Sequence, residues 1–262
     1  AVLARWFRIC GFRKVRVPAF TWVSTYAPFA WLGYDVKFVD IHPLDWMAEF
    51  GDSIPETHEL VVPVDTFGSD YPLGDMRGVK WIDSAQSLGT KWKDTDTTRV
   101  ISLSASKLVT SGEGGAILTN DSSLADFATN TGQWFSRMPE MSAALALASL
   151  SILPYVLEKK GRIREEYKRR FPEFGWQAIP NDTNGYVVAA TVPSPKDIKK
   201  DNPDSEFKHY YQNMLFPDDI LMPLERAAQN GNLPVTRKVS RAIVAFPSWP
   251  DMDIAKIREL RV

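Results

Sequence analysis

One lysine, Lys107, stands among small hydroxyl side chains between two short apolar runs. The runs at 100–103 and 116–119 are each typical of a buried strand, and the glycine-rich segment 112–115 predicts a tight turn between them. Such a loop would let a ligand approach the lysine amine closely. The alternative is an ordinary surface lysine near a hairpin, and this stretch alone leaves both interpretations open.

A carboxylate, Asp83, follows another strand-like run at 79–82. A lysine that holds pyridoxal phosphate as a Schiff base needs an acidic partner for the pyridinium nitrogen, because that ion pair keeps the ring an electron sink. Asp83 comes at the carboxyl end of its predicted strand, where the ligands of α/β folds gather. Lys107 and Asp83 together therefore suggest pyridoxal-phosphate chemistry.

The order and spacing of several motifs resemble the DegT/DnrJ/EryC1/StrS family of pyridoxal-phosphate-dependent aminotransferases. This family acts on nucleotide-linked keto-sugars. Its members have in common an Asp-x-Ala-Gln/His segment, a Ser-x-x-x-x-Lys segment and a Gly-Glu-Gly-Gly turn. The resemblance covers residues 1–170 well and the remainder more faintly. The matching segments, in chain order, are 17–25, 33–40, 83–86, 102–107, 112–115 and 137–144.

The resemblance implies a role for each of five residues. Lys107 would form the Schiff base with the cofactor and, once released, act as general base and acid. Asp83 would keep the pyridine nitrogen protonated, and Gln86 would lie beside the ring's phenolic oxygen. Ser102 would bind the phosphate, and Trp22 would stack on the ring. The alternatives are a strand-end serine that caps its own turn and an aromatic residue of the core.

The activity that the resemblance implies is transfer of an amino group from an amino acid, usually glutamate, to a nucleotide-linked keto-sugar. The family builds each active site from two subunits, so a homodimer is implied as well. One alternative is a catalytically weak or inactive regulatory or binding relative of the same fold. Another is a lyase or desulfurase of that fold, although the combined motifs disfavour it. The lysine itself argues against the 3-dehydratase branch, which replaces it.

Three departures from the family pattern concern the partner subunit, the sugar and the phosphate. Phe135 stands where relatives often carry an Asn that reaches the partner's cofactor. No C-terminal His aligns with the one that relatives bring towards the sugar, because His209 lies in a different context. The sequence opens within a helical pattern at 1–11, past the family's phosphate-binding turn. A natively short chain, a fragment, or a phosphate held by fewer groups would each explain this.

Composition argues against several other classes of protein, namely nucleic-acid-binding, membrane, disulfide-bonded and metal-binding proteins. The chain has 262 residues with 31 Lys and Arg against 32 Asp and Glu, so no basic field favours nucleic acid or an anionic membrane. A single cysteine, Cys10, excludes an internal disulfide, and His42, His58 and His209 lack the spacing of metal ligands. No apolar run approaches the length of a membrane span, so a cytoplasmic location is expected.

Alternation of short apolar runs with helical or polar connections predicts an α/β fold with a largely parallel sheet. The resemblance makes this the three-layer, aspartate-aminotransferase-like fold type I, with a large cofactor-binding domain at 1–140, incomplete at its N-terminus. The connecting helix and a small α+β domain would occupy 141–262. A helix is expected at 138–171 with a bend at Pro154. The other expected elements are strands at 15–17, 36–39, 60–64, 79–82, 100–103, 116–119 and 185–192, a polar loop at 195–203 and a helix at 207–215.

Overall fold

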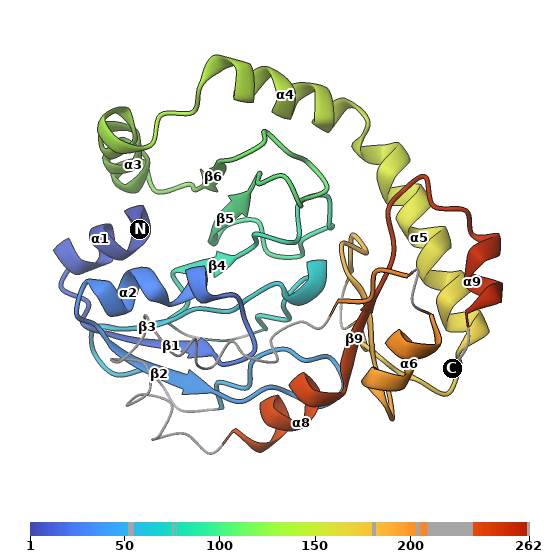
Figure 1. Cartoon of the computed structure of the whole chain (residues 1–262). Helices are drawn as coiled ribbons and strands as arrows, with labels where there is room; N and C mark the ends of the chain where they lie inside the picture. The colour runs from blue at the N-terminus through green and yellow to red at the C-terminus, as the bar shows by residue number, and fades with distance from the viewer. Residues whose placement is uncertain are drawn as a thin grey trace.

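The first half of the chain forms two neighbouring three-stranded sheets. The structure, a computed structural model, describes residues 1–51, 55–74, 76, 78–179, 182–202, 205–208 and 233–260. One sheet has the order β2-β1-β3 and the other β4-β5-β6 (Figure 1). The strands are β1 (Lys14–Pro18), β2 (Asp35–Val39), β3 (Glu59–Val61), β4 (Trp81–Asp83), β5 (Thr98–Ser102) and β6 (Gly115–Leu118).

Parallel pairing dominates these sheets, as the sequence predicted. Strand β1 pairs in parallel with β2 and with β3, and β4 pairs in parallel with β5. Strand β6 is the exception, because it runs antiparallel to β5. Two isolated parallel bridges, Val61 to Val79 and Val64 to Asp83, connect the edges of the two sheets. The carboxyl ends of β4 and β5 therefore lie side by side, and they carry Asp83 and Ser102.

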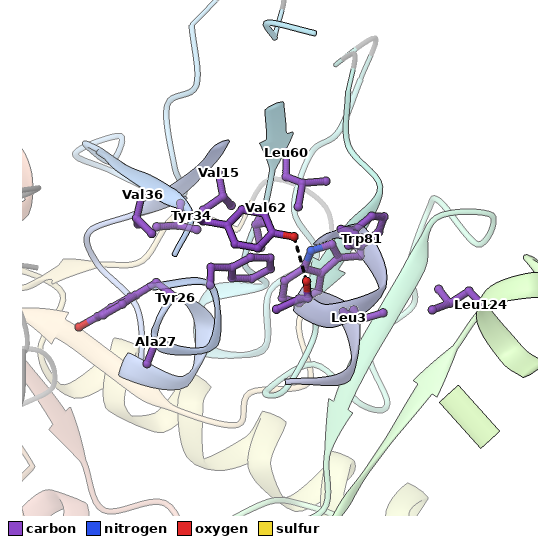
Figure 2. Close-up of a cluster of buried hydrophobic side chains, with 14 residues drawn as sticks. Leu3, Val15, Tyr26, Ala27, Tyr34, Val36, Leu60, Val62, Trp81 and Leu124 are labelled. Atoms are coloured by element: carbon purple, nitrogen blue, oxygen red, sulfur yellow. Dashed lines mark hydrogen bonds between the residues drawn. The ribbon is translucent and has the colours of Figure 1, made fainter. Parts of the chain in front are cut away.

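Three helices cover this part of the chain: α1 (Val2–Ile9), α2 (Ala27–Trp31) and α3 (Ser122–Phe135). Figure 2 shows the core that they share with the strands. Tyr34 closes this core with a hydrogen bond from its hydroxyl to the carbonyl oxygen of Ala4, 2.8 Å away. Side chains such as Val15 and Leu60 are fully buried here, because every second residue of a strand faces the helices. The buried members are Leu3, Ala4, Phe7, Val15, Val17, Tyr26, Ala27, Phe29, Tyr34, Val36, Leu60, Val62, Trp81 and Leu124.

A bent pair of helices leads from the first half to the second. Helix α4 (Glu140–Ser151) meets α5 (Leu153–Arg170) at an angle of 56°, with Pro154 in the first turn of α5. The bend expected at Pro154 is confirmed, since proline is accepted in a first turn but not inside a helix. None of the described helices is by itself long and apolar enough to cross a membrane. Helices α4 and α5 meet that test only when they are counted together.

The second half contributes an antiparallel sheet, β7-β8-β9, packed on α5 (Figure 1). Its elements are β7 (Gly175–Trp176), β8 (Val188–Thr191), α6 (Pro195–Asp201), α8 (Pro234–Ala242), β9 (Ile243–Phe246) and α9 (Ala255–Glu259). Ala189 and Ile243 also pack against Phe20 and Phe67 of the first half. The division into domains at residue 140 stays a prediction.

The prediction of a polar loop at 195–203 is wrong for most of its length, because Pro195–Asp201 form the helix α6. Pro195 opens this helix after Ser194, and Asp197 lies in its first turn. That combination is a helix start signal, because proline is preformed for the first position and an acidic side chain suits the helix dipole. The helix expected at 207–215 lies outside the described residues apart from its first two positions.

A buried arginine, Arg99 near the start of β5, connects this strand with the segments that follow β3 and β4. Its Nη1 donates to Asp65 Oδ2 at 2.8 Å and to Ser84 Oγ at 3.0 Å, and its Nη2 lies 3.4 Å from Asp70 Oδ1. The guanidinium also lies 4.7 Å from the ring centroid of Trp92. Arg99 and Asp65 are both fully buried, so neither can turn to water if its partner is lost.

We expect Arg99→Met to lower the free energy of unfolding by about 3–5 kcal/mol, because it leaves the Asp65 carboxylate buried and unpaired. Urea denaturation measures this change. The matched control is Arg162→Met, which removes an exposed ion pair with Glu158 on α5 and should cost less than about 1 kcal/mol. Equal effects of the two substitutions would contradict the importance given to the buried pair.

Candidate active site

A cavity of about 400 Å³ opens at the carboxyl ends of β4 and β5. It brings together all five residues that the sequence singled out: Trp22, Asp83, Gln86, Ser102 and Lys107. They come from separate segments of the chain, and their shared location is what a ligand site at strand ends requires. The remaining lining residues are Thr21, Ser24, Thr25, Val64, Ala85, Ser104, Ser106 and Tyr186.

Asp83 is the last residue of β4 and its carboxylate is buried in this cavity wall. Its Oδ2 accepts a hydrogen bond from Thr25 Oγ1 at 2.6 Å, and its Oδ1 accepts one from the backbone N–H of Ala85 at 3.1 Å. Burial raises the pKa of Asp83, while these two donors and the charge of Lys107 oppose that rise. No cationic side chain of the described residues forms an ion pair with it.

Thr25 is a site residue that the sequence reasoning did not single out. It ends the short helix η1 (Val23–Thr25), and its hydroxyl also lies 2.9 Å from that of Thr21. Both threonines are buried, and the pair fixes the hydrogen bond that Asp83 receives. Their signal was present in the sequence, because both threonines belong to the segment 17–25 that resembles the family pattern.

Lys107 lies in the loop between β5 and β6, and its side chain enters the cavity. Lys107 is partly buried, which favours the cavity-lining interpretation over an ordinary exposed lysine. The glycine turn after it is needed for packing, because a Cβ at Gly115 would lie 2.4 Å from the carbonyl oxygen of Ile101. Gly115 thus allows β6 to pair closely with β5 beneath the Lys107 loop.

The ring of Tyr186 faces Lys107, with the lysine Nζ 4.8 Å from the ring centroid. The tyrosine hydroxyl donates to Ser106 Oγ at 3.4 Å. Asn184 fixes this segment to the first half of the chain, because its Nδ2 donates to the carbonyl oxygens of Gln86 and Leu88 at 2.8 and 3.0 Å. The sequence reasoning missed Tyr186, since nothing local connects it with a lysine 79 positions earlier.

The other three predicted residues differ in how they meet the cavity. Gln86 Oε1 accepts a hydrogen bond from the backbone N–H of Phe67 at 2.8 Å, which orients its amide. Ser102 Oγ lies 3.4 Å from the backbone nitrogen of Ser104, so the self-capping alternative describes part of its role. Trp22 is 54% exposed at the cavity wall, so the alternative of a core aromatic is wrong.

Comparison with known proteins places the chain in a family. The profile of the DegT/DnrJ/EryC1/StrS aminotransferase family matches residues 7–260. The chain belongs to this family. The match confirms the resemblance, the α/β fold type and the enzyme class, a pyridoxal-phosphate-dependent sugar aminotransferase. The side chain of Phe135 and the residue His209, on which two of the departures from the family pattern rest, lie outside the described part of the structure.

Individual relatives are distant in sequence but similar in structure. A UDP-2-acetamido-2-deoxy-3-oxo-D-glucuronate aminotransferase of Pseudomonas aeruginosa is 23% identical, over 94% of this chain and 77% of its own. A pleiotropic regulatory protein of Geobacillus stearothermophilus is 24% identical, over 91% and 74%. Helicobacter pylori PseC, an aminotransferase of pseudoaminic acid biosynthesis, superposes with a TM-score of 0.84 at 17% identity, over 99% and 81%.

The residues around the cavity fit pyridoxal phosphate. A buried carboxylate that lacks a described cationic partner, as Asp83 does, would be balanced by a protonated ring nitrogen. A lysine amine, a half-exposed indole and several hydroxyls line the same space and offer the other contacts that an anionic aromatic aldehyde requires.

A buried lysine on α5, Lys160, fixes the loops behind Tyr186. Its Nζ donates to the carbonyl oxygens of Tyr186 and Ser248, at 2.9 and 2.8 Å, and to Ser248 Oγ at 2.8 Å. Burial lowers the pKa of Lys160 from 10.5 to about 8, because the interior disfavours its charged form.

This pKa shift predicts a stability that depends on pH. Between pH 8 and 10.5 the unfolded chain binds a proton that the folded chain has released, so the free energy of unfolding rises with pH. The rise due to Lys160 should approach about 3 kcal/mol. Urea denaturation at pH 7.5 and 10.5 measures it, with Lys160→Met and Lys159→Met compared. The difference between the two pH values should shrink in the first variant and persist in the second; an unchanged difference in Lys160→Met would contradict the assignment.

Proposed function

We propose that the protein transfers an amino group from an amino acid, with glutamate as the expected donor, to a nucleotide-linked keto-sugar. The observation that carries this proposal is that Lys107 and the buried Asp83 line one cavity. The substrates acted on by the P. aeruginosa relative support the sugar class, since that protein is named for a nucleotide-linked oxo-sugar.

Lys107, Asp83 and Thr25 would carry out the chemical steps of this reaction. Pyridoxal phosphate, when bound, supplies an electron sink for the carbanion formed at the substrate. Lys107 Nζ would hold the cofactor covalently and, when released, take and return the proton moved during transfer. The Asp83 carboxylate would accept a hydrogen bond from the N–H group of the cofactor ring. Thr25 would keep that carboxylate in place through its 2.6 Å hydrogen bond.

The remaining contacts orient the cofactor. Trp22 offers an exposed indole face for stacking on the ring, and Ser102 offers a hydroxyl to the phosphate. Because Gln86 Oε1 is already bonded to Phe67, its amide nitrogen is the group that would lie beside the phenolic oxygen. The regulatory alternative is less well supported, since a binding protein needs neither the lysine nor the buried acid.

Lys107→Ala should abolish covalent attachment of the cofactor, because no other described amine enters the cavity. We expect the wild-type protein, mixed with pyridoxal phosphate and reduced with borohydride, to carry the cofactor at Lys107 in peptide maps. Transamination should fall by about 10³-fold or more in the variant. The matched control, Lys80→Ala, removes an exposed lysine and should leave both unchanged. Wild-type protein that is not labelled at saturating cofactor would refute the enzyme assignment and favour the regulatory alternative.

The proposal includes a second copy of this chain as partner, through the exposed apolar surface of α4. Met141 is 87% exposed and Leu147 69% exposed on this helix, and Leu145 and Leu150 are exposed beside them. Apolar surface of this extent on one helix is typical of a protein–protein interface.

Leu147→Glu should therefore convert a dimer into a monomer, because a charge would be buried without a partner at the interface. Sedimentation velocity of the purified protein measures the mass. Leu44→Glu, at a leucine that is 63% exposed in the segment after β2, is the control that should leave the mass unchanged. A monomeric wild-type protein, or a Leu147→Glu variant with the wild-type mass, would contradict the interface.

A further inference from the structure

A second cavity, of about 480 Å³, adjoins the first. The two share Ser106, Lys107 and Tyr186, so these residues form a common wall. On the far side the second cavity is lined by residues of α5, of the segment that follows β9 and of the segment before the undescribed residues 209–232. Because Lys107 faces both spaces, a ligand in the second cavity would lie beside the proposed reaction centre.

Lys160 gives this cavity a buried positive charge. The residue is 4% exposed, and its Nζ donates to three uncharged oxygens, those of Tyr186 and Ser248. No carboxylate of the described residues forms an ion pair with it. A buried ammonium group that lacks a counter-charge is costly, and an anion in the adjoining space would offset that cost.

The remaining walls have the same character. Among the described lining residues, Lys107 and Lys208 add two ammonium groups and Glu206 is the one carboxylate; Glu206 and Lys208 are both exposed. Trp249 and Phe246 supply an apolar side, with the indole of Trp249 52% exposed. The cavity therefore combines an excess of positive charge with a flat apolar surface, which suits an organic anion rather than a cation or a neutral apolar molecule.

We infer that this second cavity binds the anionic part of a substrate, a carboxylate or a phosphate, with Lys160 supplying a buried charge at its floor. The inference rests on the proposed function for its place in catalysis, beside Lys107. Two sources of the anion share this chemistry, namely the side-chain carboxylate of a dicarboxylic amino donor and the diphosphate of a nucleotide-linked sugar. All three N–H groups of Lys160 are engaged, so its effect is through charge, while Lys208 is placed to donate directly.

Isothermal titration with glutarate and, separately, with inorganic pyrophosphate tests the inference. The protein is used both without cofactor and after loading and reduction with borohydride, which occupies the first cavity. We expect saturable binding of one probe in both forms, weakened about tenfold or more in Lys160→Met. Lys159→Met, which removes the neighbouring lysine that lies over Tyr155, should bind within about twofold of the wild type.

The two probes distinguish the sources, since the tighter one identifies dicarboxylate or diphosphate. Absence of saturable binding, or equal affinities in the two variants, would overturn the inference. If Lys160→Met does not fold, as judged by its thermal unfolding, Lys208→Met replaces it, with a loss of about threefold expected and wild-type affinity overturning the inference. If no cofactor can be loaded, the proposed function fails, and the titration without cofactor still decides whether the site exists.

Discussion

The buried ion pair between Arg99 and Asp65 is the interaction on which the site depends most. Asp65 Oδ2 also accepts hydrogen bonds from the hydroxyls of Ser84 and Ser87, at 2.7 and 2.6 Å. One carboxylate thereby connects the segment after β3 with the segment that follows Asp83, while Arg99 belongs to β5, which ends in Ser102. Because the charges are buried, these segments cannot separate without leaving an unpaired ion in the interior.

Two further buried charges of opposite sign lie in adjoining cavities. Asp83 gives the first cavity a negative floor, and Lys160 gives the second a positive one. Neither forms an ion pair within the described chain. Asp83 accepts hydrogen bonds from two neutral donors, and Lys160 donates hydrogen bonds to neutral oxygens. Such charges cost stability, and proteins keep them where function needs a fixed field. Lys107 belongs to the wall that the two cavities share.

The second half of the chain completes the site through a few contacts. Two hydrogen bonds hold Tyr186 beside Lys107. Asn184 donates one to the carbonyl oxygen of Gln86, and Lys160 donates the other to the carbonyl oxygen of Tyr186. Helix α5 thus contributes to the site indirectly: its residue Lys160 holds the backbone of Tyr186, whose ring faces Lys107.

The sequence by itself determined the family, the parallel strand pattern and five residues of one cavity, because these depend on local motifs such as 83–86 and 102–107. It missed α6, although Ser194 and Pro195 carried a helix start signal. Only the tertiary structure decided that Tyr186 faces Lys107, that Thr25 bonds Asp83 and that Lys160 is buried among neutral oxygens. These contacts join residues that are far apart in the chain. Burial affects the charge state of a side chain and the strength of its hydrogen bonds, and burial is a property of the packed fold.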